Sequence, residues 1–305
     1  MDQLSYYMSS LLAQYQHISW PSPAKLNLFL HITGQRQDGY HELESLFQMT
    51  DYGDTLTFAP NNTGEVRLMT AFPDVAHDDN LIVKAAKILK NYCHINAGVD
   101  ISIEKVLPMG GGIGGGSTNA ATVLMVLNRL WECHLSDNTL ATIGLTLGAD
   151  VPVFIHGQTT FARGVGEKFT PAPNTDAVFL VIHPGIHIST KDIFNSPDLC
   201  RNTPSIDFCD YTFNNTHNDC QQLVVNLYPK VANLLQHLLH YAPSRLTGTG
   251  ACVFAIFDKE ETAQQALLTI QHQQILDNTG HAFICRGLAE SPLQTKIKTI
   301  FDVRD

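Results

Sequence analysis

Charged residues are scarce in this sequence, and basic residues are scarcer than acidic ones. Charged residues make up 16% of the 305 residues, and 19 basic against 29 acidic residues give a formal net charge of −10. No run of Lys and Arg forms the basic stripe that is typical of nucleic-acid-binding proteins. We therefore expect no nucleic-acid partner. The 44% of hydrophobic residues indicates a globular chain rather than a disordered one.

Metal, redox and membrane signatures are also missing. The cysteine number is odd (seven), with no C-x-x-C, and the 14 histidines include no H-E-x-x-H. This pattern indicates free thiols in a cytoplasmic protein and excludes the common zinc motifs. Residues 1–24 contain no Lys or Arg, so they lack the basic start of a signal peptide. No apolar run is long enough to span a membrane, and we expect no membrane partner.

Glycine, in contrast, is concentrated at one place. Six of the seven residues 110–116 are glycine, within "MGGGIGGGST". The run follows an expected strand, "GVDISIEKVLP", and precedes an expected helix, where Ser117 and Thr118 are candidate caps. Glycine lets the backbone wrap closely around an anion, and a helix N-terminus offers it unpaired N–H groups. The run therefore predicts a phosphate cradle rather than a flexible turn.

Two better-known phosphate loops fit the glycines less well. A Walker A loop needs a lysine where this chain has Ser117. The dinucleotide pattern G-x-G-x-x-G does match, but any glycine run satisfies it. The element that follows, from Ser136, is a predicted helix and not the strand that would carry a ribose-binding acid. A nicotinamide-dependent oxidoreductase therefore remains only an alternative.

The predicted elements mix without strict β-α-β alternation, which favours an α+β fold. Apolar periodicity predicts helices over 80–93, from about 120 to 131, 136–148, 219–241 with a break at Pro229, and 260–276. Alternating or buried patterns predict strands at "AKLNLFLHI", "DTLTFAP", "EVRLMTA", "DAVFLVIHP", "ACVFAIF" and "AFICRGL", and a hairpin at "TTFARGVGEKFTP". Residues 1–19 form an appended segment that we expect to be helical around residues 4–12 and either to pack on the surface or to fray.

Three stretches in a fixed order point to a family. "SPAKLNLFL", "LPMGGGIGGGSTNAA" and "LTGTGACVF", together with "DGYHELESLFQ", "LGADVPVFIHG" and "ARGVGE", resemble the GHMP kinase superfamily from residue 20 onwards. The resemblance implies a two-domain kinase with a ribosomal-protein-like nucleotide-binding domain at 20–160 and a ferredoxin-like α/β sandwich domain at 161–305. It also implies ATP and Mg²⁺ as cosubstrate and metal. "NDCQQLV" departs from the family pattern, and we expect this segment to be peripheral.

The motifs are most similar to those of GHMP kinases that phosphorylate the 2-hydroxyl of a cytidine-diphosphate-linked methylerythritol, a step of the non-mevalonate route to isoprenoid precursors. By this resemblance, Asp150 is the general base and Lys25 is the cation that assists it. From the residues alone, Asp150 reads as a cap or turn aspartate and Lys25 as an edge lysine. A buried pair of the two would be costly as pure structure, so a meeting of the two would favour function.

The resemblance also assigns the two binding sites. The residues assigned to ATP are Asn80, Lys105, Pro108, Met109, Gly110, Gly111, Gly112, Ile113, Gly114, Gly115, Gly116, Ser117 and Thr118. Ser117 is in addition a candidate ligand of the metal, and Asn80 is placed to cap a helix. The residues assigned to the cytidyl substrate are Asn27, Tyr40, His41, Phe47, Thr190 and Phe194, with Tyr40 and Phe194 on opposite faces of the cytosine.

Other functions remain open at this point. A different GHMP kinase, of the mevalonate or homoserine type, would share the three motifs but not "DGYHE". A non-catalytic RNA-binding module would share the ribosomal-protein-like fold, and the acidic charge argues against it. The sequence is compatible with a monomer or a homodimer.

Overall fold

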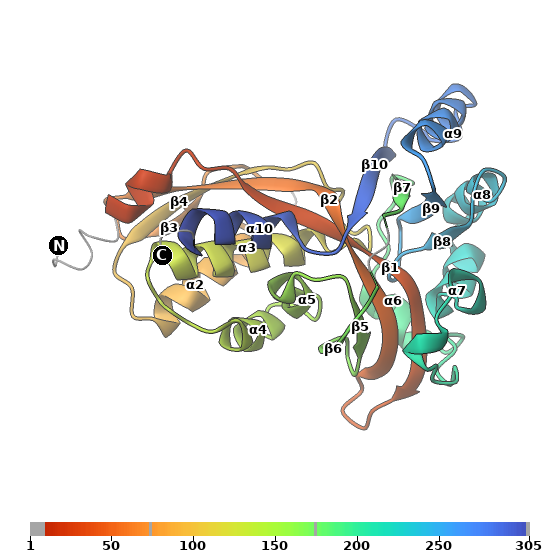
Figure 1. Ribbon diagram of the computed structural model, residues 1–305, viewed down its shortest axis with the longest axis horizontal. Coiled ribbons are helices and arrows are strands. Elements are labelled where there is room, and N and C mark those ends of the chain that lie inside the picture. The colour runs from red at the N-terminus through yellow and green to blue at the C-terminus, as the bar shows by residue number, and fades with distance from the viewer. Residues whose placement is uncertain (1–9, 73–74, 174–175, 303–305) are drawn as a thin grey trace.

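Two long strands connect the two lobes of the molecule. The structure is a computed structural model, and it describes residues 10–72, 75–173 and 176–302. Strands β1 (Trp20–Gln35) and β2 (His41–Asn61) pair antiparallel and extend from the first lobe, at the left in Figure 1, into the second. Because both strands pass between the lobes, their side chains can contact either one.

The first lobe is built on a sheet packed against helices. Strand β4 pairs antiparallel with β2 and parallel with β3, and α2 supplies the crossover that a parallel pair requires. The apolar faces of α2 and α3 join the sheet in one buried core. The elements are β3 (Val66–Leu68), η1 (His77–Asp79), α2 (Leu81–Tyr92), β4 (Gly98–Glu104), α3 (Gly115–Leu130), α4 (Asp137–Leu145), α5 (Val151–His156), β5 (Thr160–Arg163) and β6 (Lys168–Pro171).

The second lobe is a four-stranded antiparallel sheet covered by helices. Its strand order β10-β7-β9-β8, with helices after β7 and after β9, is the order of a ferredoxin-like β-α-β-β-α-β unit. The elements are β7 (Val178–His183), α6 (Thr190–Asn195), η2 (Phe208–Asp210), η3 (Phe213–Asn215), α7 (Asp219–Leu227), α8 (Pro229–Leu238), β8 (Ser244–Leu246), β9 (Val253–Phe257), α9 (Glu260–His272) and β10 (His281–Leu288). The α+β prediction and the ferredoxin-like second half are confirmed.

One continuous sheet runs through both lobes. Strand β10 pairs with β2 at Gly287 opposite Thr50 and at Leu288 opposite Met49. The chain then returns to the first lobe through α10 (Pro292–Ile297), which packs against β1, and the π-helix η4 (Lys298–Asp302). Leu293 and Ile297 are buried in the first core. The division at residue 160 stays a prediction, but the last described residues pack with the first half.

Most predicted elements are present, with several shifts at their ends. Asn80 caps α2 and Ser136 caps α4 through their side chains, and Pro229 starts α8 after the break, as predicted. Helix α4 ends at Leu145, three residues before the predicted stop at Gly148, and α9 ends at His272. Strand β2 begins at His41 and so includes "ELESLF".

The N-terminal segment contributes to the core of the first lobe. Residues 10–15 are helical, and the part of the predicted helix before residue 10 lies outside the described residues. Leu12 is fully buried and Tyr15 nearly so, and both join the first core. The ring of Phe301 stacks on Trp20, with centroids 5.8 Å apart, and also contacts Tyr15. The segment therefore does more than cover the surface.

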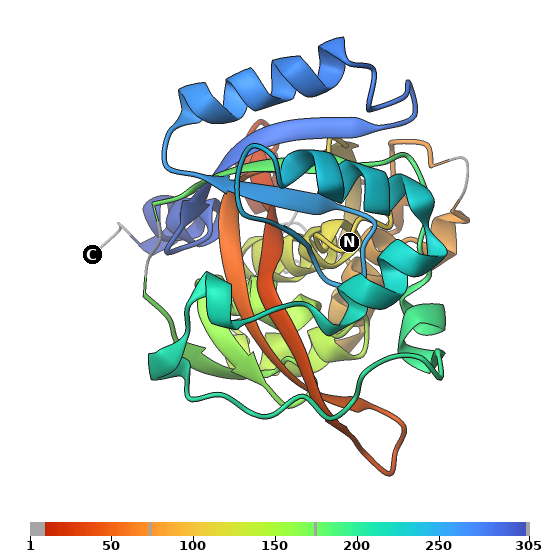
Figure 2. The same cartoon turned by 90° about the vertical axis from the view of Figure 1, so that its right-hand side faces the viewer.

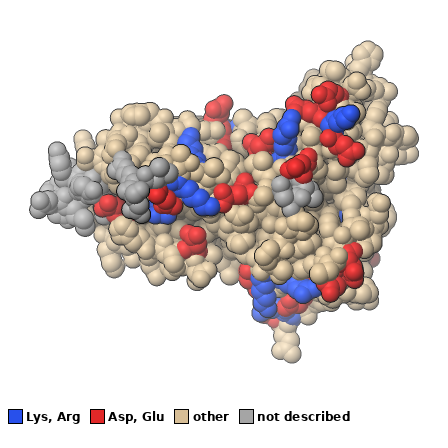
Figure 3. Space-filling model, viewed as in Figure 1, with Lys and Arg blue, Asp and Glu red and all other residues tan. Residues whose placement is uncertain are grey.

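Charged side chains of both signs lie close together on the surface. On the face in Figure 3 they gather near β10 and α9 and around the β1–β2 hairpin, with acidic and basic groups interspersed. Arg286 with Glu260 is one such ion pair, at 2.6 Å. Within the described residues, no helix is long and apolar enough to cross a membrane.

Candidate active site

The motifs from the two halves of the sequence meet at one cavity of about 240 Å³. Its walls come from β1, β2, the glycine-rich loop, the start of α5, the β5–β6 turn, α6 and the loop before β9. Eight of the residues assigned from the sequence line it: Lys25, Asn27, Phe47, Gly112, Ser117, Asp150, Thr190 and Phe194.

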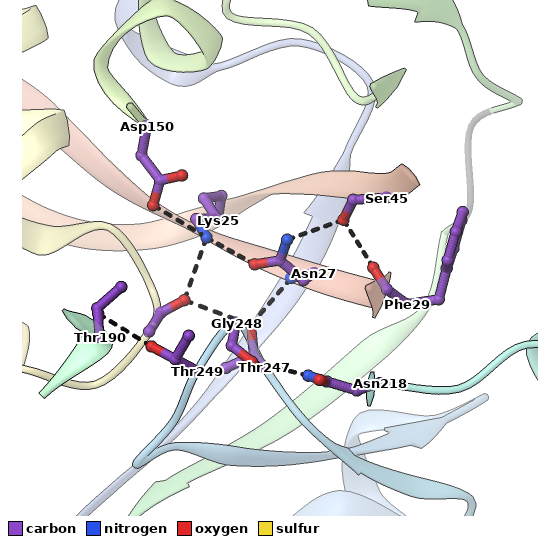
Figure 4. A network of polar contacts seen from close by, with 11 residues as sticks. Lys25, Asn27, Phe29, Ser45, Asp150, Thr190, Asn218, Thr247, Gly248 and Thr249 are labelled. Carbon is purple, nitrogen blue, oxygen red and sulfur yellow. Dashed lines mark hydrogen bonds and ion pairs between the residues drawn. The ribbon is translucent and has the colours of Figure 1, made fainter. Parts of the chain in front are cut away.

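Lys25 is buried at the centre of this site, 2% exposed, with an acceptor for each of its three protons. Its Nζ donates to Asn27 Oδ1 at 2.6 Å and to the Gly112 carbonyl at 3.2 Å, and it forms an ion pair with Asp150 Oδ2 at 3.2 Å (Figure 4). The ammonium also lies 5.2 Å from the centre of the Phe47 ring. These contacts fix the charge in one position, so Lys25 is buried, although β1 pairs with β2 alone among the described strands and is an edge strand.

Asp150 is the acid that faces this cation. It precedes α5, but its side chain forms no capping hydrogen bond. The carboxylate is 36% exposed and lines the cavity, whereas its partner Lys25 is buried. Asp150 therefore occupies the N-cap position in a turn, as its surroundings in the sequence predict, but without a side-chain capping bond, and its carboxylate lines the cavity.

Asn27 holds Lys25 in place, and Ser45 in turn orients Asn27. Asn27 Nδ2 donates to Ser45 Oγ at 2.8 Å, and Ser45 Oγ donates to the Phe29 carbonyl. This chain of hydrogen bonds orients the Asn27 amide so that its oxygen faces Lys25 (Figure 4). Asn27 thus contacts the site as a support of Lys25 as well as a wall of the cavity.

The carbonyl groups of the glycine-rich loop face the protein. Those of Gly110 and Gly111 accept from the backbone N–H groups of Ala251 and Cys252, both at 3.1 Å, and that of Ile113 accepts from the Lys25 N–H. Gly112 has φ of +72°, and a Cβ there would lie 2.4 Å from the Thr247 carbonyl oxygen. The glycines are therefore needed partly for close packing against residues 247–252.

The N–H groups of the same loop are left for a ligand. Within the described residues, the N–H groups from Gly112 to Ser117 have no hydrogen-bond partner in the protein, whereas that of Thr118 donates to the Gly114 carbonyl. The first turn of α3, which begins at Gly115, contributes three of them. A row of unpaired N–H groups that ends in a helix N-terminus suits phosphate oxygens.

The start of α3 differs from the prediction. Gly114, with φ of +77°, is the N-cap, and Ser117 and Thr118 lie inside the first turn, so the prediction that they cap the helix is wrong. Thr118 is buried, and its hydroxyl accepts from Ser22 at 3.2 Å. Ser117 lines the cavity. Gly114 satisfies the left-handed backbone angle that a Ser or Thr cap would adopt only with strain.

Lys105 and Asn80 are held by neighbouring residues. Lys105 Nζ donates to Asp54 Oδ2 at 2.9 Å, and burial lowers the pKa of this lysine, against the opposing effect of Asp54. The Asn80 side chain accepts from the Ile82 N–H at the start of α2. Pro108, Met109 and the loop glycines other than Gly112 are not part of the cavity wall.

Only some of the residues assigned to the cytosine lie close to one another. The His41 and Phe194 rings stack with centroids 5.0 Å apart and planes inclined by 28°. Tyr40 is 62% exposed, and no ring contact to it occurs among the described residues. Thr190 pairs its hydroxyl with that of Thr249 at 3.0 Å (Figure 4). The sandwich of Tyr40 and Phe194 therefore stays a prediction.

Several residues of the site were not singled out from the sequence. Gly248 and Thr249, within "LTGTGACVF", line the cavity, as do Val165 and Gly166, within "ARGVGE". Those two motifs were the signal that could have identified them.

The expectation that "NDCQQLV" is peripheral is wrong. Asn218 is 3% exposed, and its Nδ2 donates to the carbonyls of Leu246 and Gly248, both at 2.8 Å. The next residue, Asp219, accepts from the Ile32 N–H on β1. The segment therefore supports the loop that forms one wall of the cavity, and only the folded chain reveals this.

The sequence comparison identifies the family. The profile of the GHMP kinases N terminal domain matches residues 80–158, and that of the GHMP kinases C terminal domain matches residues 205–274. The chain belongs to the GHMP kinases. This membership sets aside the nicotinamide-dependent alternative, as does the sheet, in which only β3 and β4 form a parallel pair among the described strands.

Within the family, the similar relatives share one name. "4-Diphosphocytidyl-2-C-methyl-D-erythritol kinase" of Pseudoalteromonas atlantica is 53% identical over 91% of this chain and 95% of the relative. The enzyme of that name from Vibrio cholerae is 53% identical over 93% of this chain and 94% of the relative. A crystal structure of 4-(cytidine 5'-diphospho)-2C-methyl-D-erythritol kinase superposes with a TM-score of 0.76 at 26% identity, covering 88% of this chain and 99% of that one. A mevalonate kinase, at a TM-score of 0.64 and 16% identity, shares the fold.

Proposed function

We propose that this chain transfers the γ-phosphate of ATP to the 2-hydroxyl of 4-diphosphocytidyl-2-C-methyl-D-erythritol, in the non-mevalonate route to isoprenoid precursors. The relatives support this proposal because they carry that name at over 50% identity and align over nearly their whole length. The observation that carries it is the Lys25–Asp150 ion pair, which faces the cavity beside the unpaired N–H groups of the glycine-rich loop.

The ion pair suits a general base. The substrate hydroxyl in the cavity gives its proton to the Asp150 carboxylate while its oxygen forms a bond to the γ-phosphorus of ATP. The bond between that phosphorus and the β,γ-bridging oxygen breaks, and ADP leaves. Lys25 stabilises the negative charge that develops on the attacking oxygen, and its fixed position means that little reorganisation is needed at that step.

The glycine-rich loop is suited to bind the triphosphate. Backbone N–H groups of residues 112–117 donate to the phosphate oxygens, and Lys105 adds a positive charge beside the start of α3, 3.5 Å from where a Cβ of Gly115 would lie. Asn80 and residues 108–111 complete the nucleotide site. Both hydrogen-bonding groups of Thr118 already have partners, so we assign it the support of the loop rather than a direct contact.

A magnesium ion bound with ATP would neutralise phosphate charge and help to orient the transferred group. Within the described residues, no group of three His, Cys, Asp or Glu side chains could hold a metal ion by itself. This fits a magnesium ion that keeps its waters and is held mainly by the phosphates. The Ser117 hydroxyl, on the cavity wall, is the candidate protein ligand.

The cytidyl group is proposed to bind at the second-lobe end of the cavity. A base in the plane of His41 would lie nearly parallel to the Phe194 ring, because the two rings are inclined by 28°. Asn27, Phe47 and Thr190 line the path from there to Asp150. We place the reaction in the cytoplasm, because all seven cysteines are free thiols.

A panel of substrates tests the assignment. Purified protein with Mg²⁺ and ATP should release ADP with the cytidyl substrate and not with mevalonate or homoserine. Release with mevalonate at comparable kcat/KM would contradict the substrate assignment and leave the kinase class intact. The oligomeric state, monomer or homodimer, is read from the same preparation by light scattering.

A further inference from the structure

A polar segment, residues 196–218, crosses the hairpin of β1 and β2 (Figure 2). Its backbone is tied to β1 by the Thr203 N–H, which donates to the Ile32 carbonyl. Glu44 on β2 accepts from the Ile206 N–H, and Arg163 bridges Glu44 to the Ile206 carbonyl. The segment is therefore held in one place next to the residues assigned to the cytosine.

Arg201 on this segment reaches His41. Its Nε donates to His41 Nε2 at 3.0 Å. Its Nη groups donate to three carbonyls around the end of α6: Leu199 at 3.0 Å, Phe194 at 2.8 Å and Ser196 at 2.7 Å. No carboxylate forms an ion pair with Arg201 among the described residues. The guanidinium thus links the two rings of the base site, through the backbone of Phe194 and the side chain of His41.

This contact determines which nitrogen of the His41 imidazole carries the hydrogen. A guanidinium can only donate hydrogen bonds, so His41 Nε2 must accept, and the proton of the neutral ring must be on Nδ1. Burial, and secondly the positive charge of Arg201, lower the pKa of His41 and favour its neutral form. Within the described part of the chain, Nδ1 has no hydrogen-bond partner. It is an N–H donor without a protein acceptor.

We propose that Arg201 is a positioning residue that keeps the proton of His41 on Nδ1 and so makes the site select cytosine over uracil. The inference rests on the proposed function, in which His41 faces the edge of the base. N3 of cytosine is an acceptor and pairs with an N–H donor, whereas N3 of uracil carries a hydrogen and would meet that donor unpaired. A site built to hydrogen-bond one partner rejects an analogue that leaves its group unpaired.

Three variants separate this role from a structural one. Arg201→Gln replaces a pure donor by an amide that can also accept, so either imidazole tautomer is allowed. Arg201→Lys keeps a pure donor and is the conservative variant. Arg163→Met is the matched control, because Arg163 holds the same segment through Glu44 but does not touch His41.

The measurement is calorimetric binding of CDP and of UDP to each full-length protein, with ¹⁵N NMR of the histidines to observe the tautomer of His41. The wild type should prefer CDP, with the Nδ1–H form of His41. Arg201→Gln should lower the ratio of CDP to UDP affinity at least tenfold and give mixed tautomers, at unchanged affinity for ATP. Arg201→Lys and Arg163→Met should retain most of the preference.

Two results would overturn the inference. One is an unchanged CDP preference in Arg201→Gln. The other is an equal loss in Arg163→Met, which would mean that any loosening of the segment has this effect. Failure of the proposed function is distinguishable, because a wild type that prefers CDP but does not phosphorylate the cytidyl substrate would refute that function and leave the role of Arg201 standing.

Discussion

Replacement of Asp150 by Asn tests the proposed chemistry most directly. The carboxamide has nearly the same size and its oxygen can still accept from Lys25, but it cannot take up a proton. The Asp150 side chain does not cap α5, so the helix does not depend on it. Lys25 retains its bonds to Asn27 and to the Gly112 carbonyl. We therefore expect a folded protein that binds both substrates.

The expected magnitude follows from the lost proton transfer. General-base catalysis contributes about 10²–10⁴-fold, which corresponds to roughly 2.7–5.5 kcal/mol of transition-state stabilisation at about 1.36 kcal/mol per tenfold. The fall should be in kcat, with both KM values nearly unchanged, because the interaction is made mainly in the transition state. The loss of stability should stay within about 1.5–3 kcal/mol, the range for a hydrogen bond to a charged group, since Asp150 is only partly buried.

The assay is coupled ADP release at saturating ATP, with circular dichroism to confirm folding. Asp258→Asn, an acid-to-amide change at an exposed position of the second lobe, is the control and should be fully active. Lys25→Met should also lower kcat, and the double variant should lose far less than the product of both losses, because the pair acts as a unit. Near-normal kcat in Asp150→Asn would refute the general base, and multiplicative losses would refute the coupling.

Four further outcomes are expected. Gly115→Ala places a methyl 3.5 Å from Lys105 Nζ, an ordinary contact distance, so the protein should keep its fold or be stabilised by up to about 1 kcal/mol. Calorimetry should nevertheless show a Kd for ATP that is at least about tenfold higher. Gly34→Ala is the control. Phe194→Ala should raise KM for the cytidyl substrate by an amount worth roughly 1–3 kcal/mol, with KM for ATP unchanged in the same kinetic assay. Asn218→Asp cannot donate to the two carbonyls it now pairs, so thermal denaturation should show a loss of about 1–3 kcal/mol per unpaired group, and kcat should fall. Urea unfolding should show stability falling from pH 6.5 to pH 5, because burial lowers the pKa of His31 in the folded protein, so the unfolded chain binds more protons in that window.

Each of these outcomes has a result that contradicts it. ATP binding that is equal in the Gly115 and Gly34 variants would remove the phosphate cradle. A larger effect of Phe194→Ala on ATP than on the cytidyl substrate would mean that the two sites are exchanged. Unchanged stability and kcat in Asn218→Asp would make that segment peripheral after all. A free energy of unfolding that is constant or rises toward pH 5 would mean that protonation of His31 does not control stability in this pH range.

Much of the site was visible in the sequence because local signals carry it. The glycine run, the capping Asn80 and Pro229 at the start of α8 each depend on residues close in the chain. Backbone angles, caps and apolar periodicity are set within a few residues, so the elements and the phosphate loop follow from them. The start of α3 was mispredicted because the choice between Gly114 and Ser117 as N-cap depends on the left-handed angle that the packed loop imposes.

Which distant residues come into contact depends on the tertiary fold. The pairing of Lys25 with Asp150, the support that Asn218 gives to the loop before β9, and the contact of Arg201 with His41 each join segments far apart in the sequence. The return of α10 to the first core is of the same kind. Such contacts leave no local pattern, because their free energy comes from burial and hydrogen bonding that exist only after the sheet brings both lobes together. The elements and the glycine-rich loop therefore follow from signals close together in the sequence, whereas the fold sets the geometry of Asp150, Lys25 and His41.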